Sequence, residues 1–453
     1  QYVDCETSTQ AECLDRVAQR AVQTPKGSWI RGHGWNQNDW QEGYGTASQL
    51  DAIAPDHPVY LTAKSLHASW ANSLALNLAG INGNSTDPQG GQIHRDLSGQ
   101  PTGILFENAT GLIENVIPQP GIDDVRLAIE KTQQTLIKIG LTGVHDFDRS
   151  MCFQALQHLD ENHCLLLRVV KSISHENLDQ AVEVGLRSGF GSEHLRLGAV
   201  KLFSDGALGP QTAAMLSPYE GSIDNVGFLL LTADEIFDIG RRAAGSGISL
   251  ATHAIGDQAN REVINGYAML RAYEDKHNLP RLRHRIEHVQ VLHPDDLNRL
   301  AELNITASMQ PIHTTSDMFT ADRYWGSRAR YAYAFRSLLA HGTRVAFGSD
   351  APVESPNPFW GIHAAVTRRR PDGSPGIEGW QPQEKISLQH ALEAYTTGPA
   401  YLAGVENHLG RLSPGYLADL IVLPSRLLSE HPDNIYQLRP QAVMIAGEWV
   451  WQQ

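Results

Sequence analysis

Short apolar segments recur seven times after Gly140, and each is followed by a turn and then by a helical pattern. The segments are residues 142–147, 165–170, 195–203, 248–255, 285–290, 305–311 and 344–352. Strands that are apolar on both faces and that alternate with helices are typical of a parallel sheet, because crossover helices cover it. The pattern therefore predicts an α/β chain folded as a (β/α)8 barrel of the TIM type, one strand short of the full count.

The sequence before these units is irregular. Residues 12–22 and 123–139 have the apolar spacing of amphipathic helices, and residues 58–63 have that of a strand. Turn-rich stretches separate these elements. We therefore interpret residues 30–120 as a large insertion after the first barrel strand, lying over the barrel mouth.

The sequence after the last barrel helix predicts a small appendage. Residues 418–423 and 442–451 each have the pattern of a strand, and a turn-like stretch precedes them. We expect residues 1–405 to form the barrel unit. Residues 406–453 are then expected to be the C-terminal part of a small β-sandwich domain.

The composition limits the classes of function. The 453 residues include 36 Lys and Arg against 50 Asp and Glu, a net charge of −14, which argues against nucleic-acid binding. No run approaches the roughly 20 apolar residues of a membrane helix. We therefore expect a cytoplasmic protein with a small-molecule substrate, no nucleic-acid or membrane partner, and a homodimer as a candidate assembly. The 20 histidines favour a metal site.

Polar residues stand where the predicted barrel strands end, which is where a barrel enzyme carries its active site. Each one alone has an ordinary structural explanation, because a single histidine in a strand is usually a hydrogen-bonded core residue. Residues of metal-binding type at successive strand ends are harder to explain in that way. The four candidate metal ligands are Lys201, His253, His288 and Asp350, and Asp350 is also the candidate catalytic proton carrier.

Lys201 is the most informative of these residues. It lies in an apolar strand, where loss of hydration would lower the pKa of its ammonium group. The neutral amine can then react with carbon dioxide to form a carbamate, whose two oxygens can bind metals. The alternative is a structural lysine that reaches solvent from the strand end or pairs with Asp205.

Loops over a barrel mouth commonly supply substrate contacts. The candidate substrate-binding residues are His313, Trp35, His67, Asp317 and Arg328. The alternative is packing for the aromatic residues and a solvated surface for the charged ones. Asp257 is expected to cap a helix that begins at Gln258 rather than to bind metal.

Five motifs in the second half of the chain resemble the amidohydrolase superfamily. They are the stretches at residues 200–206 (VKLFSDG), 253–257 (HAIGD), 285–288 (RIEH), 310–313 (QPIH) and 348–352 (GSDAP). With the GHGW stretch at residues 32–35 and the stretch at 410–423, the resemblance covers nearly the whole chain. It is strongest to the branch that contains N-substituted formamide deformylases.

The resemblance implies a binuclear metal centre, usually of zinc, in which a carboxylated Lys201 and a hydroxide bridge the two ions. His253, His288 and Asp350 complete the implied ligand set. The implied reaction is metal-activated hydrolysis of a non-peptide C–N bond, of amide or formamide type, in a small molecule. Two alternatives stay open: an esterase or lactonase that uses the same centre, and an inactive barrel that serves as a binding module.

One motif of the superfamily is absent, since no His-x-His pair occurs before residue 140. His33, His67 and His94 each stand alone. Together with the missing eighth strand and a first residue that is not Met, this absence leads us to expect that an N-terminal segment carrying the pair precedes Gln1. The alternative is that His67 takes the place of the pair.

Overall fold

The computed structural model describes residues 2–424, 427 and 431–453. The chain divides into two compact units. The first unit consists of residues 1–119 together with the short segments 206–213 and 225–230. The second consists of residues 120–205, 214–224 and 231–453.

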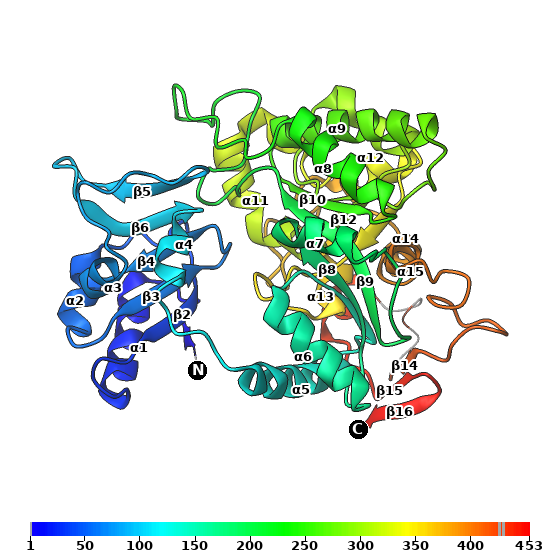
Figure 1. Ribbon diagram of the computed structural model, residues 1–453, viewed down its shortest axis with the longest axis horizontal. Coiled ribbons are helices and arrows are strands. Elements are labelled where there is room, and N and C mark those ends of the chain that lie inside the picture. Colours follow the sequence, from blue (N-terminus) through cyan, green and yellow to red (C-terminus); the bar gives the residue numbers. More distant parts are fainter. Residues whose placement is uncertain (1, 425–426, 428–430) are drawn as a thin grey trace. The chain divides into compact units, whose positions relative to one another are not determined.

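The first unit is built on a six-stranded mixed sheet with the strand order β1-β2-β3-β4-β6-β5. The strands are β1 (Val3–Asp4), β2 (Ile30–Trp35), β3 (Val59–Ala63), β4 (Ala68–Ala71), β5 (Gly91–Arg95) and β6 (Pro101–Glu107). Its helices are α1 (Gln10–Gln23), α2 (Ala47–Ile53), α3 (Ser73–Leu78) and α4 (Thr110–Glu114), drawn in blue to cyan in Figure 1. The predicted helix at 12–22 and strand at 58–63 are therefore present. Because β1 pairs with β2, the unit starts before residue 30, where the insertion was expected to start. A position over the barrel mouth stays a prediction.

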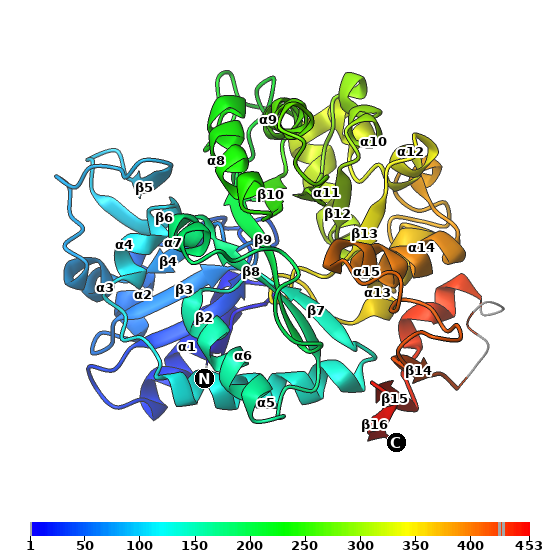
Figure 2. The same cartoon turned by 45° about the vertical axis from the view of Figure 1, so that its right-hand side comes forward.

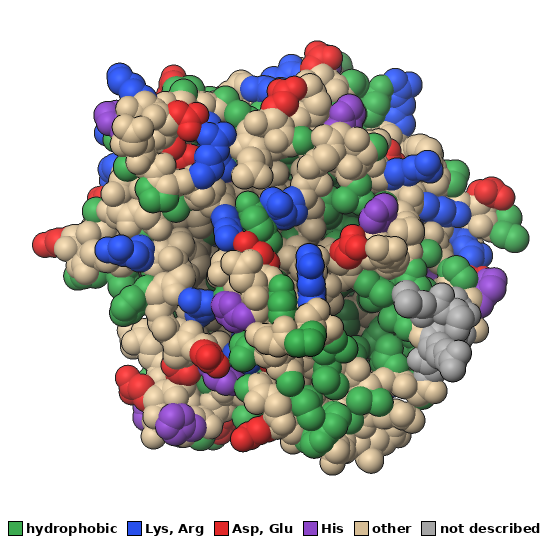
Figure 3. Space-filling model, turned by 90° about the vertical axis from the view of Figure 1, so that its right-hand side faces the viewer, with side chains coloured by type: hydrophobic (Ala, Val, Ile, Leu, Met, Phe, Trp, Pro, Cys, Tyr) green, Lys and Arg blue, Asp and Glu red, His purple; other side chains and the backbone are tan. Residues whose placement is uncertain are grey.

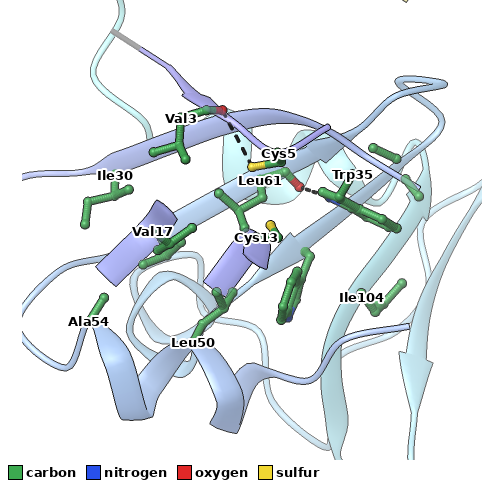
Figure 4. Close-up of a cluster of buried hydrophobic side chains, with 14 of the residues drawn as sticks. Val3, Cys5, Cys13, Val17, Ile30, Trp35, Leu50, Ala54, Leu61 and Ile104 are labelled. Carbon is green, nitrogen blue, oxygen red and sulfur yellow. Dashed lines mark hydrogen bonds between the residues drawn. The ribbon is translucent and has the colours of Figure 1, made fainter. Parts of the chain in front are cut away.

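The core of this unit lies between α1, α2 and the sheet (Figure 4). Helix α1 begins after Thr9, whose hydroxyl accepts a hydrogen bond from the Glu12 amide, and it turns Cys13 and Val17 into the core. Leu61 on β3 is fully buried, and a side chain added at Gly32 on β2 would lie 2.7 Å from it. The core is therefore packed closely enough that a shortened side chain leaves a cavity.

We expect Leu61→Ala to lower the free energy of unfolding by about 2–5 kcal/mol, through lost burial and the cavity that remains. The control is Val22→Ala on α1, because Val22 is 89% exposed and its truncation should cost less than about 0.5 kcal/mol. Urea denaturation followed by tryptophan fluorescence measures both. Equal effects of the two substitutions would contradict this description of the core.

The second unit is built on a seven-stranded parallel sheet (Figures 1 and 2). Its strands follow one another in sequence order, and each overlaps one of the seven predicted segments. They are β7 (Gly143–Asp146), β8 (Arg168–Ser174), β9 (Leu195–Phe203), β10 (Leu250–Ala254), β11 (Arg285–His288), β12 (Thr306–Met309) and β13 (Val345–Phe347). Helices lie before, between and after them: α5 (Ile122–Lys138), α6 (Ser150–Glu161), α7 (Leu178–Glu183), α8 (Ala233–Gly245), α9 (Asp257–Lys276), α10 (Arg299–Glu302), α11 (Pro311–Trp325), α12 (Phe335–Ala340), α13 (Pro358–Thr367), α14 (Leu388–Tyr395) and α15 (Thr397–Ala403).

A contact between distant strands shows that this sheet is strongly curved. His145 on β7 and Arg285 on β11 are joined by a hydrogen bond of 2.7 Å between Nδ1 and Nη1, although three strands lie between them. In a flat sheet, with neighbouring strands about 4.8 Å apart, they would be about 19 Å from each other. This curvature and the unreversed strand order fit a TIM-like barrel. Among the described residues, β13 and β7 do not pair and no eighth strand joins this sheet.

The C-terminal residues form a three-stranded antiparallel sheet of β14 (Leu420–Val422), β15 (Ala442–Ile445) and β16 (Glu448–Gln452). The prediction of one strand over 442–451 is wrong, because Ala446 and Gly447 form a turn with φ values of 53° and 84°. Positive φ at both central residues is typical of the tight turns of β-hairpins. Arg168 on β8 anchors the sheet through two hydrogen bonds to Asp419, of 2.7 and 3.0 Å. Membership of a β-sandwich stays a prediction.

The surface shown in Figure 3 carries acidic and basic side chains side by side, with hydrophobic side chains gathered in its lower part. None of the helices formed by the described residues has the length and apolar character needed to cross a lipid bilayer.

His363 on α13 makes the stability of the second unit sensitive to acid. The residue is buried, and its ring lies 5.3 Å from that of Tyr436. Burial lowers the pKa of His363 to about 4, while Asp433 opposes the lowering and Arg369 adds to it. An unfolded histidine titrates near pH 6.5. Between these two pKa values the unfolded chain binds more protons, so the contribution is complete above about pH 6.5 and is lost as the pH falls toward 4.

We therefore expect His363→Gln to reduce the loss of stability on acidification by on the order of 1 kcal/mol per pH unit in that window. Urea denaturation at several pH values between about 7 and about 5 measures the change. His341→Gln is the control, because His341 is exposed. An identical pH dependence in both variants would show that His363 titrates normally in the folded protein.

Candidate metal centre

Five titratable side chains stand at or just beyond the C-terminal ends of neighbouring strands of the curved sheet. Lys201 is near the end of β9, His253 is in β10, and His288 is the last residue of β11. His313 lies in the first turn of α11, directly after β12, and Asp350 follows β13. Because parallel strands present their carboxyl ends at one edge, the fold brings these side chains together.

The cluster has the dimensions of a metal site. The ligand atoms of His288, His313 and Asp350 lie within 4.8 Å of one another. His313 Nε2 is 3.4 Å from an oxygen of Asp350, and the rings of His253 and His288 are 4.6 Å apart. His313, predicted as a substrate contact, therefore lies among the candidate ligands.

The backbone is strained at two members of this cluster. His288 has a φ of 76° and Asp350 a φ of 60°, in the left-handed region that side chains other than glycine rarely adopt. Each such residue costs of order 1–3 kcal/mol, and strained residues of this kind collect at functional sites. The strain therefore supports a functional role for these positions.

Lys201 is buried between two aromatic rings, with its Nζ 4.9 Å from the centre of Phe147 and 4.7 Å from that of Phe203. Burial lowers the pKa of Lys201 to about 8; Glu287 and Asp350 oppose this effect, and Arg285 adds to it. With a pKa near 8, roughly a tenth of the lysine is a neutral amine at pH 7. This is the form that can react with carbon dioxide.

The electrostatics of the other three groups also suit metal binding. Burial lowers the pKa of His288 well below its ordinary value, and the neighbouring His253 adds to this effect, so its imidazole is neutral and can act as a ligand. Burial alone would raise the pKa of Asp350, but the hydrogen bond with His313 and the neighbouring His288 and Lys201 together outweigh this effect, so the pKa is lowered. Burial likewise opposes protonation of His313, and Asp350 nevertheless raises its pKa. Asp350 is therefore a carboxylate.

The donor set fits a divalent metal ion. It consists of neutral imidazoles, a carboxylate and an amine that can become a carbamate, a mixture of nitrogen and oxygen donors that suits first-row divalent metals. His253, His288 and Asp350, with Lys201 as the carbamate, would hold the metal. All four of these residues belong to the second unit.

Two predicted substrate contacts lie in the first unit. Trp35 is fully buried in the core, and its indole nitrogen donates to the Leu61 carbonyl at 2.9 Å. This placement makes Trp35 a packing residue, in contrast to the predicted substrate contact. His67 Nδ1 is 2.8 Å from Glu107, which also accepts a hydrogen bond from the Thr212 hydroxyl. Among the described residues, His67 does not join a metal-binding cluster, and its substrate contact stays a prediction.

The other two predicted contacts lie in the second unit. Asp317 on α11 accepts a hydrogen bond from the Tyr333 hydroxyl and helps to raise the pKa of His313, as a lesser cause after Asp350. Arg328 donates to the carbonyls of Ser217 at 2.6 Å and Pro218 at 2.7 Å. Its guanidinium therefore holds a backbone segment. Substrate contact by Asp317 and Arg328 stays a prediction.

The structure also identifies polar residues around the centre that the sequence analysis did not place there. Gln310 contacts His288, and Asp205 contacts His253 rather than forming the alternative ion pair with Lys201. Arg285 and Glu287 form a buried ion pair of 2.7 Å that faces His145 and Lys201. Alternation along β11 could have revealed this ion pair, since residues two apart in a strand share a face.

Comparison with known proteins identifies the family of this chain. The model of the amidohydrolase family matches residues 3–451. Protein LONG AFTER FAR-RED 3 of Arabidopsis thaliana is 34% identical over 435 residues, which are 93% of this chain and 74% of that protein. The N-substituted formamide deformylase of Arthrobacter pascens is 29% identical over 446 residues, covering 93% of this chain and 79% of the enzyme.

A solved structure agrees with both fold and family. The crystal structure of an uncharacterized metal-dependent hydrolase from Pyrococcus horikoshii OT3 has a TM-score of 0.73 and 27% identity, covering 95% of this chain and 83% of that one. The family match extends over nearly the whole chain, and the strand ends carry residues that suit a divalent metal. The chain therefore belongs to the amidohydrolase family.

Proposed function

We propose that this protein is a metal-dependent hydrolase that cleaves a non-peptide C–N bond, of amide or formamide type, in a small molecule. The observation that carries the proposal is the cluster of His288, His313 and Asp350, whose ligand atoms lie within 4.8 Å of one another near the buried Lys201. The similarity to an N-substituted formamide deformylase supports the bond class. Zinc, as two ions, is the metal that we propose.

Lys201 is proposed to enter the centre as a carbamate. Its neutral Nζ adds to the carbon of carbon dioxide, a C–N bond forms, and a proton leaves to solvent, so that an anionic group with two oxygens replaces the amine. The pKa of Lys201 near 8 supplies the reactive form at neutral pH. The rings of Phe147 and Phe203 lie 4.9 and 4.7 Å from this nitrogen.

When bound, divalent ions would lower the pKa of a water molecule and polarise the substrate carbonyl. Asp350 accepts a proton from the attacking water and delivers it to the leaving nitrogen, so that the C–N bond breaks with a neutral amine as the product. The hydrogen bond with His313 orients the Asp350 carboxylate for this transfer. His253 and His288 supply neutral imidazoles.

The direct test is a substrate panel on the full chain after loading with zinc. Amine release from N-substituted formamides and acetamides is measured beside alcohol release from esters and lactones of the same size. We expect faster turnover of the amides, inhibition by a chelator, and no turnover by His288→Ala. Preferential turnover of the esters would assign an esterase or lactonase. Stoichiometric ligand binding without turnover of any compound would assign a binding module.

A further inference from the structure

Two buried polar side chains contact the candidate histidine ligands at opposite ring nitrogens. Asp205 Oδ1 lies 3.3 Å from Nε2 of His253. Gln310 Oε1 lies 2.8 Å from Nδ1 of His288. Asp205 is fully buried, and Gln310 is 6% exposed. Neither residue belongs to the proposed ligand set.

Asp205 is held rigidly by the backbone around it. Its Oδ1 accepts a hydrogen bond from the Ile255 amide at 3.0 Å, and its Oδ2 accepts from Ala214 at 2.9 Å and Gly256 at 2.8 Å. A side chain added at Gly256 would lie 1.9 Å from the Ala214 carbonyl oxygen. Only glycine therefore lets these amides converge on one carboxylate.

Ser204, the residue before Asp205, holds the backbone of His253. The Ser204 amide donates to the His253 carbonyl at 3.0 Å, and the Ser204 hydroxyl donates to the same oxygen. Ser204 and Asp205 thus hold the backbone of His253 and its ring. Because both directly follow β9, the strand that carries Lys201, they place two candidate ligands in a fixed relation.

The chemistry of the two partners determines which ring nitrogen carries the proton. A carboxylate that receives three amide hydrogen bonds can only accept, so Nε2 of His253 must donate and its lone pair is on Nδ1. An amide oxygen also only accepts, so Nδ1 of His288 carries the proton and its lone pair is on Nε2. The two neighbouring imidazoles are therefore opposite tautomers.

We propose that Asp205 and Gln310 are positioning residues that hold the rings of His253 and His288 in these opposite tautomers. This inference rests on the proposed metal centre. Carboxylates and amides behind histidine ligands set the ring orientation and raise ligand basicity, and their loss typically costs 10- to 100-fold in metal affinity. Asp205 and Gln310 act on the metal only through the histidines.

The first test reads the tautomers in the metal-free, full-length protein. Long-range proton–nitrogen NMR correlations of ¹⁵N-histidine-labelled protein identify the protonated nitrogen of each ring, with His253→Gln and His288→Gln for assignment. We expect a proton on Nε2 of His253 and on Nδ1 of His288. The opposite tautomer of either ring would overturn the proposal for its partner.

The second test measures zinc affinity by competition with a chromophoric chelator. Asp205→Asn and Gln310→Leu should each weaken zinc binding by about 10- to 100-fold. Asp257→Asn is the control for Asp205, because Asp257 is also buried and accepts an amide hydrogen bond from Leu216 at 2.8 Å.

The prediction that Asp257 caps a helix beginning at Gln258 is wrong, because Asp257 is the first residue of α9 and Gly256 is the cap.

Gln133→Leu is the control for Gln310, since Gln133 is buried and hydrogen-bonded on α5. Both controls should bind zinc within about 3-fold of the unaltered protein. Equal weakening in a test variant and its control, or unchanged affinity in the test variants, would overturn the proposal. If His288→Ala binds zinc normally while the NMR tautomers are as expected, the proposed metal centre fails and the positioning of the rings stands.

Discussion

Asp350→Asn is expected to reduce turnover by on the order of 10²- to 10⁴-fold while metal stays bound. The amide keeps the size of the carboxylate and one oxygen, but it cannot accept the proton from the attacking water. The lowered pKa of Asp350 means that the group is ionised over the whole working range, so the loss should be seen at every pH at which the enzyme is active. Steady-state rates and metal content, measured on one preparation, test both parts.

The matched control is Asp296→Asn. Asp296 is 1% exposed and forms ion pairs with Arg261 and Arg299 at 2.9 and 2.8 Å. This variant should lose stability and retain turnover. A near-normal rate in Asp350→Asn would transfer the proton-carrying role to another group, and His313 is the next candidate because of its contact with Asp350.

Lys201→Ala is expected to abolish the bridge between the metal ions and to lower turnover by about 10³-fold or more. The loss of several kcal/mol of charge stabilisation from a displaced ion corresponds to a factor of this size. Added acetate or propionate should restore part of the activity, because a short carboxylate can occupy the space of the missing carbamate. Metal analysis and ¹³C NMR after labelling with bicarbonate report the bridge directly.

A second buried lysine provides a control for this experiment. Lys171 on β8 is 1% exposed, and its Nζ lies 2.6 Å from Asp146. Lys171→Ala should be destabilised, because it leaves a partly buried carboxylate without its partner. It should nevertheless keep the ¹³C signal and the metal. A carbamate signal that persists in Lys201→Ala would refute the assignment of this group.

The strands of the barrel could be predicted from the sequence because each is apolar on both faces and short. Lys201, His253, His288 and Asp350 could be singled out for the same reason, as polar residues at the ends of apolar runs. The turn at Ala446 could not, since alanine gives no signal for a positive φ. A prediction that continues a strand through Ala446 therefore merges β15 and β16 into one strand.

Other features depend on three-dimensional packing. The sequence makes Trp35 a candidate substrate contact, and only the packing around it shows that its ring is buried. His313 was expected near the substrate, but its contact with Asp350 depends on how β12 and β13 are placed beside each other. Asp205 and Gln310 act through hydrogen bonds to particular ring nitrogens, which no spacing along the chain encodes.

The contact of His145 with Arg285 joins residues 140 positions apart in the chain. The candidate ligands are equally scattered, and they become neighbours only when the sheet has curved. An ion held by all of them therefore binds the native state and has no comparable site on the unfolded chain. By mass action, its binding free energy then adds to the stability of the fold, so a saturating metal would raise the thermal midpoint and a chelator would lower it.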